Sequence, residues 1–193
     1  VQLPLAGTAI AFVLALLMVF LRIQEPDNRN YDFVKLIKIV ANKFARFYIF
    51  VIRGTPMMVQ SLIFYYAIFN LFKRTGMSVT EINRVWSLFI SGLVTVSLNS
   101  TAYLAEVLRG GILAVDAGQM EAARSLGMTH WQAMRRVVFP QAIKNSLPAI
   151  GNEFIINIKD SSVLCVLGVS DLMFMTRSVA GIYYKGTECY LIA

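Results

Sequence analysis

Long apolar segments alternate with shorter polar ones along this chain. Residues 3–21 are almost wholly apolar, and their length is close to the roughly 20 residues that a helix needs to cross a bilayer. Three more segments of comparable apolar character follow at 47–72, 85–108 and 142–169. The pattern therefore predicts an all-α integral membrane protein, a polytopic helix bundle with four membrane-spanning helices.

The segments between these spans differ in kind. Residues 22–46 carry basic residues among apolar ones at helical spacing, which predicts an amphipathic helix lying on the membrane surface. Residues 73–84 read as a turn-rich connector that leads to Trp86, an expected interfacial anchor. Residues 168–187 are mixed and expected to be interfacial, and a new apolar run begins at Leu191. Because the chain does not begin with Met and stops within that run, we expect a piece to be missing at each terminus.

One polar, helix-forming island lies between the third and fourth spans, at residues 116–140. Two spacings that fit a capping box frame it: Asp116 with Gln119, and Thr129 with Gln132. Gly127 stands where the first helix should end in a left-handed residue, and Pro140 is expected to stop the second. The island is therefore predicted to be two short helices, folded at Gly127 and held at a membrane surface.

Composition argues against a soluble protein. The chain of 193 residues is 57% hydrophobic and 15% charged, whereas about 25% of residues are charged in typical soluble domains. Its net charge of +7 prompts the question of nucleic acid, and residues 123–136 could be read as a DNA-binding helix-turn-helix. A unit tethered between two bilayer-length spans could hardly enter a groove, so we expect no nucleic-acid partner.

Basic residues are distributed unevenly among the loops. Most lie in the first loop or around the island: Arg22, Arg29, Lys35, Lys38, Lys43, Arg46, Arg109, Arg124, Arg135, Arg136 and Lys144. The two remaining loops hold Lys73, Arg74, Arg84, Arg177 and Lys185. Because cytoplasmic loops carry an excess of Lys and Arg, the first loop and the island are predicted to be cytoplasmic.

Ionisable groups inside a membrane are costly unless they face a cavity or a partner, so each is a candidate functional residue. In the fourth span Glu153, Asn157 and Asp160 share one helical face, with Asn152 and Lys159 in the adjoining row. One interpretation is a polar wall along a central path, offering both charge signs to a zwitterion. The other is that Lys159 and Asp160 neutralise their neighbours or lie at the mouth of a shorter span.

Polar residues also follow the third span at helical spacing. Ser91 and Thr95 are small hydroxyl residues of the kind that packs between membrane helices, and we interpret them so. Asn99 is a full amide at mid-depth, which favours a place on the path. In the second span Arg53 is expected only to extend its charge to the interface.

Nothing in the sequence indicates catalysis. There is no G-x-x-x-x-G-K-[ST] motif, so the chain is not expected to bind ATP through a P-loop. No nucleophile–base pair stands out. His130 is the sole histidine and has no second ligand nearby, so no metal site is expected.

The island resembles a known loop. Glu121-Ala122-Ala123, Gly127 and the run Val137-Val138-Phe139-Pro140 resemble the Glu-Ala-Ala-x3-Gly-x9-Ile-x-Leu-Pro loop of ATP-binding cassette importer permeases. The apolar replacements at Val137 and Phe139 are mild departures. Three further runs resemble the polar amino acid uptake branch, with its histidine-, glutamine- and arginine-type permeases: Arg53-Gly54-Thr55-Pro56 with Gln60; Asn99-Ser100-Thr101-Ala102-Tyr103 with Glu106 and Arg109-Gly110-Gly111; and Lys159-Asp160-Ser161-Ser162-Val163.

The resemblance implies a single permease domain over residues 1–193, of the type I importer kind. It implies about five spans in the full protein, four of them here with the start of a fifth, in the inner, cytoplasmic membrane. A cytoplasmic coupling loop is implied at about 109–140. The chain itself would be non-catalytic and hold no cofactor, because ATP and Mg²⁺ bind to separate ATPase subunits. The other implied partners are an extracytoplasmic substrate-binding protein, a second permease copy or paralogue, membrane lipid, and a polar amino acid as substrate.

The resemblance also implies roles for individual residues. The ATPase-coupling residues would be Glu121, Ala122, Ala123, Gly127 and Pro140. The substrate path would be lined by Asn99, Ser100, Glu153, Asn157, Lys159 and Asp160. Two alternatives remain: an ion-coupled carrier or channel that works alone, with Glu153 and Asp160 as ion sites, and a structural or sensing membrane subunit. The identity of the amino acid, and homodimer against heterodimer, stay open.

Overall fold

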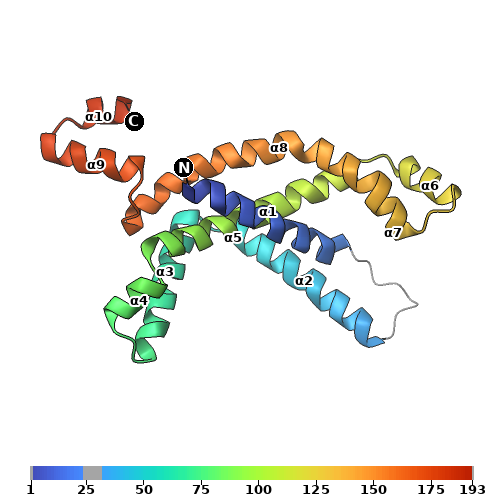
Figure 1. Cartoon of the computed structure of the whole chain (residues 1–193), viewed down its shortest axis with the longest axis horizontal. Helices are drawn as coiled ribbons and strands as arrows, with labels where there is room; N and C mark the ends of the chain where they lie inside the picture. The colour runs from blue at the N-terminus through green and yellow to red at the C-terminus, as the bar shows by residue number, and fades with distance from the viewer. Residues whose placement is uncertain (1, 24–31, 193) are drawn as a thin grey trace.

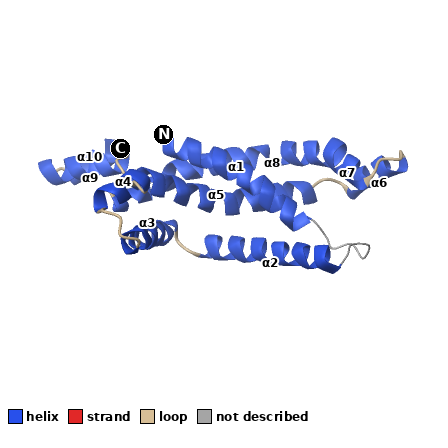
Figure 2. Ribbon diagram, turned by 60° about the horizontal axis from the view of Figure 1, so that its bottom comes forward, coloured by secondary structure: helices blue, strands red, loops and turns tan. Residues whose placement is uncertain are grey.

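Long helices account for most of the chain. The computed structural model describes residues 2–23 and 32–192, and this part of the chain contains no strand. Helices α1 (Gln2–Ile23), α5 (Leu88–Leu113) and α8 (Phe139–Asp160) lie side by side, with α5 packed against both others (Figure 1). Helices α2 (Asp32–Gly54) and α3 (Met57–Arg74) form a second layer against them (Figure 2). The predicted all-helical bundle is confirmed.

Small residues hold the central layer together. Ala11 and Ala15 of α1 are fully buried, as are Ala102 and Ala105 of α5. At Gly111 of α5, an added Cβ would lie 1.9 Å from the Ser146 Oγ atom of α8. Membrane helices often associate through such residues, because these let the backbones approach closely.

Much of the outer surface is apolar. Helices α1 and α5 are each long and apolar enough to cross a membrane, and two bent pairs of helices also pass that test together. The side of α2 turned away from the bundle exposes large apolar residues, among them Phe33, Val40, Phe47 and Phe50. The predicted pattern of spans is therefore recovered, with changes at the second and fourth.

The second span is bent where one span over residues 47–72 was predicted. Helix α2 runs without interruption to Gly54, and α3 follows at an angle of 111°, so the division into a surface helix at 22–46 and a span at 47–72 is wrong. The cause is Pro56, which disfavours a helical conformation in the preceding residue and caps α3 with a ψ of 136°. Within the surface helix predicted at 22–46, residues 24–31, which include Arg29, lie outside the described residues.

The predicted connector 73–84 is more ordered than expected. Gly76 makes the turn with a φ of +87°, and α4 (Val79–Val85) follows. Ser78 and Glu81 form a capping box, in which the Glu81 carboxylate accepts from the Ser78 backbone N–H and hydroxyl at 2.8 Å each. These bonds lower the pKa of the Glu81 carboxyl. Trp86 at the end of α4 is buried, so its prediction as an interfacial anchor is wrong.

The last part of the chain changes direction. Helix α8 ends at Asp160 and tightens into a 3₁₀ segment, Ser161–Leu167, so the continuous span predicted to residue 169 is wrong. Gly168, with a φ of +91°, ends that segment. Helices α9 (Leu172–Tyr183) and α10 (Gly186–Ile192) follow, where a mixed interfacial segment was predicted. Together they lie at the end of the molecule away from α6 and α7 (Figure 1).

Candidate functional site

The polar face of α8 is buried in its middle and opens toward its end. Glu153 and Asn157 are 6% and 2% exposed, so both face the interior. Asp160, at the last residue of the helix, is partly exposed. Asn152 and Lys159, from the adjoining row, are exposed. The predicted polar row therefore contains an interior part and an accessible part.

Asn157 joins three helices through its amide. The Ser100 hydroxyl of α5 donates to Asn157 Oδ1 at 2.7 Å, and Asn157 Nδ2 donates to Thr8 Oγ1 of α1 at 3.0 Å. The Thr8 hydroxyl donates in turn to the Pro4 carbonyl at 2.7 Å. Because a buried amide is costly unless it is bonded, this set specifies how the three helices pack.

Asn99 links α5 to the bend between α2 and α3. Its Nδ2 donates to Gln60 Oε1 at 3.0 Å. Gln60 Nε2 donates in turn to the carbonyls of Ile52 and Thr55, at 2.7 and 3.0 Å. These carbonyls lose their helical partners at the bend, so Gln60 supplies the missing donors. We call the side chains of this set and the preceding one the buried polar layer: Thr8, Gln60, Asn99, Ser100 and Asn157.

Three of the residues predicted to line a substrate path belong to the buried polar layer. Asn99, Ser100 and Asn157 bond between helices, and their role on a substrate path stays a prediction. Ser91 and Thr95, interpreted as packing residues, are fully buried, which confirms that interpretation.

Charged side chains from α2 and α8 gather beside this layer. The Arg53 guanidinium lies 5.1 Å from the centre of the Tyr103 ring, a cation–π geometry. Glu153 lies within electrostatic range of both Arg53 and Asp160. Arg53 is exposed and brings a cation within electrostatic range of Glu153. That Arg53 extends its charge to an interface stays a prediction. The sequence signal was present in the Arg53-Gly54-Thr55-Pro56 run, but the bend that turns α3 aside was not predicted.

The polar island forms the α6–α7 loop, which we define as residues 116–140. Helix α6 (Ala117–Ser125) ends at Gly127, whose φ of +83° confirms the predicted left-handed turn. Thr129 and Gln132 form the predicted capping box at the start of α7 (His130–Ala133). Asp116 caps α6 as predicted, with its carboxylate accepting from the Gly118 N–H at 2.6 Å. The reciprocal bond from Gln119 that a capping box requires is wrong, because the Gln119 side chain accepts from Gln141 instead.

Pro140 does not stop the second helix of the loop, as was predicted. Helix α7 continues through a π turn, Met134–Val138, into α8, and Pro140 stands in the first turn of α8. A proline inside a continuous helix removes one backbone hydrogen bond, and here that position directly follows the π turn. The wider π turn shifts the hydrogen-bond pattern just before it. The second half of the loop therefore continues into α8 without a break in the helix.

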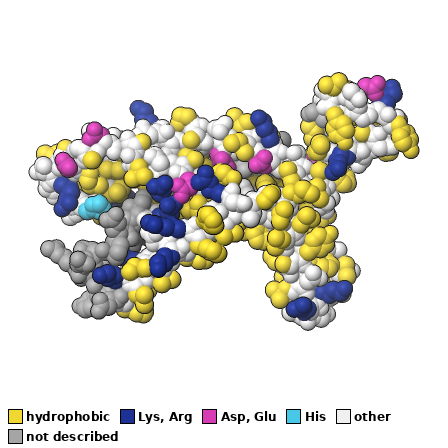
Figure 3. All heavy atoms as spheres, turned by 180° about the vertical axis from the view of Figure 1, so that it is seen from behind, with side chains coloured by type: hydrophobic (Ala, Val, Ile, Leu, Met, Phe, Trp, Pro, Cys, Tyr) yellow, Lys and Arg dark blue, Asp and Glu magenta, His cyan; other side chains and the backbone are white. Residues whose placement is uncertain are grey.

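The α6–α7 loop presents a mixed surface at one end of the molecule. Glu121 and Ala122 are exposed, Ala123 is buried at 4%, and Leu126 at the turn is 81% exposed. Acidic, basic and apolar side chains lie next to one another over this end, with the single histidine among them (Figure 3). Such a mixture around an exposed apolar residue suits contact with another protein.

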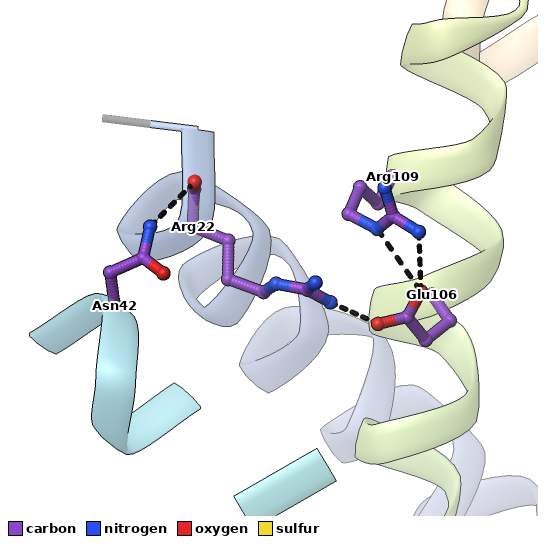
Figure 4. Close-up of polar contacts among 4 residues, drawn as sticks. All are labelled: Arg22, Asn42, Glu106 and Arg109. Atoms are coloured by element: carbon purple, nitrogen blue, oxygen red, sulfur yellow. Dashed lines mark hydrogen bonds and ion pairs between the residues drawn. The ribbon is translucent and has the colours of Figure 1, made fainter. Parts of the chain in front are cut away.

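Two long-range contacts beside the loop were missed in the sequence. The Trp131 ring of α7 meets the Phe20 ring of α1 edge to face, with centroids 6.1 Å apart. Arg22, at the end of α1, pairs with Glu106 of α5, which also pairs with Arg109 (Figure 4). Only the i, i+3 spacing of Glu106 and Arg109 could have been read locally.

Within residues 2–23 and 32–192, no three His, Cys, Asp or Glu side chains gather as a metal site needs. His130, the one histidine, is exposed at the start of α7. The expectation that the chain holds no metal stays a prediction.

The proteins with sequences similar to this chain are membrane components of transport systems. Residues 33–185 match the family model described as binding-protein-dependent transport system inner membrane component. The glutamine transport system permease protein GlnP of Escherichia coli K12 is 34% identical over 151 residues, which are 78% of this chain and 65% of the relative. The probable amino-acid permease protein YxeN of Bacillus subtilis 168 is 38% identical over 152 residues, 79% of this chain and 64% of the relative. The nopaline transport system permease protein NocM of Agrobacterium fabrum C58 is 32% identical over 158 residues, which are 80% of this chain and 64% of the relative.

A solved structure shows the same fold. The crystal structure of an amino acid ABC transporter with histidines matches with a TM-score of 0.79 and 40% sequence identity, over 99% of this chain and 78% of that one. The present chain spans 64 to 65% of the length of the three relatives above. These matches confirm the family resemblance that was predicted from residues 116–140. They also confirm the predicted type I permease architecture.

Proposed function

We propose a function for this chain from one premise: the chain belongs to the family of binding-protein-dependent transport system inner membrane components. The function that the site supports best is that of the transmembrane permease subunit of an ATP-driven importer for polar amino acids. The α6–α7 loop carries this proposal, because it is an exposed, internally capped docking surface joined without a break to a helix with a buried polar face. The names of the relatives, which include amino-acid and glutamine permeases, agree with it.

In this proposal the α6–α7 loop lies in the cytoplasm and docks into an ATPase subunit. Glu121 and Ala122 face that partner, Ala123 packs the helix against the rest of the loop, and Gly127 makes the turn. Pro140 begins the helix that receives the movement. The permease catalyses no reaction itself, since ATP and Mg²⁺ bind to the ATPase and hydrolysis takes place there.

The substrate path lies along α5 and α8. Glu153, Lys159 and Asp160, with Arg53 opposite, offer both charge signs, which is what the ammonium and carboxylate of an amino acid require. Asn99, Ser100 and Asn157 form the wall behind them, held by the buried polar layer. An extracytoplasmic binding protein delivers the amino acid, and a second permease copy or paralogue completes the path from the other side.

Movement of the loop then changes access to the path. When the ATPase subunits close on ATP, they draw the two α6–α7 loops of the permease pair together. Each α8 follows because the π turn joins it to α7 without a flexible break. The path changes from inward to outward facing, and hydrolysis resets it. Such a two-state cycle needs only that the ATPase binds the two permease states with different affinity.

Assembly and stimulated hydrolysis test the proposal. The permease should co-purify with its ATPase, and ATP hydrolysis by the complex should rise when a binding protein loaded with a polar amino acid is added. A permease that binds no ATPase, or a deletion strain whose amino acid uptake is unchanged, would contradict the proposal. Uptake driven by an ion gradient without ATP would favour the stand-alone carrier, with Glu153 and Asp160 as ion sites.

A further inference from the structure

We propose that Arg22, Asn42, Glu106 and Arg109 form a clamp that makes α1 and α2 move together with α5 and the α6–α7 loop. The proposal rests on the proposed function, because it assigns these side chains a role in coupling ATP hydrolysis to import. They are positioning residues that join the end of α1 to α2 and α5 (Figure 4). None of them is among the residues proposed to line the substrate path.

One carboxylate lies at the centre of the clamp. Glu106 of α5 accepts from the Arg22 guanidinium with one oxygen and from Arg109 Nη2 and Nε with the other, at 3.0 and 3.1 Å. The side chains of Arg22 and Glu106 are 14% and 20% exposed. A pair that is mostly shielded from water is stronger than a surface pair, and Arg holds a carboxylate in a defined geometry.

The clamp also reaches the second layer of helices. Asn42 of α2 donates from Nδ2 to the main-chain carbonyl of Arg22 at 3.0 Å. That carbonyl belongs to the last turn of α1. One arginine therefore ties α1 to α5 through its side chain and to α2 through its backbone.

An aromatic contact brings the α6–α7 loop into the same set. Phe20 stands two residues before Arg22 and meets Trp131 of α7 edge to face. The last turns of α1, which carry Phe20 and Arg22, thus contact both the α6–α7 loop and α5. A displacement of α7 is passed to α1 through these rings, and from α1 to α5 and α2 through Arg22.

The chemistry of the clamp allows one link to be cut selectively. Arg22→Gln removes the tie between α1 and α5 but leaves the Glu106–Arg109 pair within α5. Glu106→Gln leaves two guanidinium groups side by side without a shared carboxylate, so it should be the more damaging change. Arg46→Gln is the matched control, because Arg46 is an exposed arginine of α2 with no ion pair to any described residue.

The test compares uptake with hydrolysis in the same proteoliposomes, which hold the permease, its ATPase and its binding protein. In Arg22→Gln we expect the amount of amino acid imported per ATP hydrolysed to fall about tenfold, within the range of measured couplings between sites. Assembly and the hydrolysis rate should stay within about twofold, and Arg46→Gln should match the wild type. Arg22→Gln combined with Glu106→Gln should lower the ratio no further than Glu106→Gln alone, since both remove one contact.

Each result decides between the two proposals. An unchanged ratio in Arg22→Gln, or uptake and hydrolysis falling in equal proportion, would overturn the clamp and leave the importer intact. A wild-type complex without ATP-driven uptake would overturn the importer and the clamp with it. If Arg22→Gln does not assemble, Phe20→Leu decides in its place, with Phe44→Leu on the exposed face of α2 as its control. A lowered ratio in Phe20→Leu alone would support the clamp.

Discussion

The α6–α7 loop and the buried polar layer are both polar regions in an apolar chain, and they use their polar groups in opposite ways. In the loop, Thr129 and Gln132 satisfy each other within one turn, so the surface stays free to bind. In the layer, Asn157 bonds to Ser100 and Thr8, residues far away in the sequence, so the bonds join α1, α5 and α8.

This difference separates the docking part of the molecule from the part that holds its shape. Local bonds stabilise the loop before any partner arrives, and long-range bonds fix which helices move as a unit. A substitution of an exposed side chain in the loop should therefore affect docking with little loss of stability. A substitution in the layer should affect stability first.

The largest effect should come from Gly127→Val. A Cβ at a φ of +83° costs about 1–2 kcal/mol in the left-handed region, and a β-branched side chain fits it less well still. We expect the turn between α6 and α7 to change, the ATPase to bind at least about tenfold more weakly, and ATP-driven uptake to fall with it. Gly151→Val is the control, a glycine of α8 with nothing within 4 Å of an added Cβ. Equal loss in both variants would contradict this assignment.

Asn157→Ala tests whether the buried polar layer stabilises the helix bundle. It removes both interhelical bonds of the amide and should lower the stability of the permease by about 1–2 kcal/mol, visible as a lower melting temperature in detergent. Asn152→Ala, an exposed position on the same helix, should change stability by less than about 0.5 kcal/mol. Similar melting temperatures for the two variants would show that the layer does not hold the bundle.

Lys159→Met should separate a path role from a structural role. Lys159 is exposed at the open end of the polar row, so its neutralisation should leave the melting temperature unchanged. If its charge meets the substrate carboxylate, uptake should fall about tenfold, as expected for one lost charged hydrogen bond. Lys144→Met, an exposed lysine near the other end of α8, should transport normally. Normal uptake in Lys159→Met would remove this lysine from the path.

The smallest effect concerns pH and the α4 cap. The bonds from Ser78 lower the pKa of the Glu81 carboxyl below its ordinary value. The cap therefore contributes its stability at pH values above the unfolded-state pKa and loses it as the pH falls through the lower folded-state pKa. Hydrogen exchange of the α4 amides should accelerate over that acidic range, and in Glu81→Gln this pH dependence should disappear. The same acceleration in both proteins would contradict the assignment.

Local features of the fold could be predicted from the sequence and long-range ones could not. The Gly127 turn and the Thr129 cap follow from residues within a few positions, and both are confirmed. The bend after Gly54 was missed because a hydrophobic pattern continues through it, although its cause, Pro56, is local. The donors that Gln60 gives to the carbonyls of Ile52 and Thr55 follow from the bend and were missed with it. Pro140 was misread for a related reason: its effect depends on the π turn before it.

The candidate site divides in the same way. The spacing of Glu153, Asn157 and Asp160 was enough to place them on one face. It could not show that Asn157 faces Thr8, or that Arg22 pairs with Glu106, since those partners are separated by 149 and 84 positions. Such pairings are decided by how the helices pack, and a single sequence carries no direct signal for them.

The most direct test of the central claim is uptake of a labelled polar amino acid by proteoliposomes that hold the permease, its ATPase and its binding protein. We expect uptake that requires ATP, needs no ion gradient, and is lost in Gly127→Val. Uptake that proceeds on an ion gradient without ATP, and that is unaffected by Gly127→Val, would contradict it.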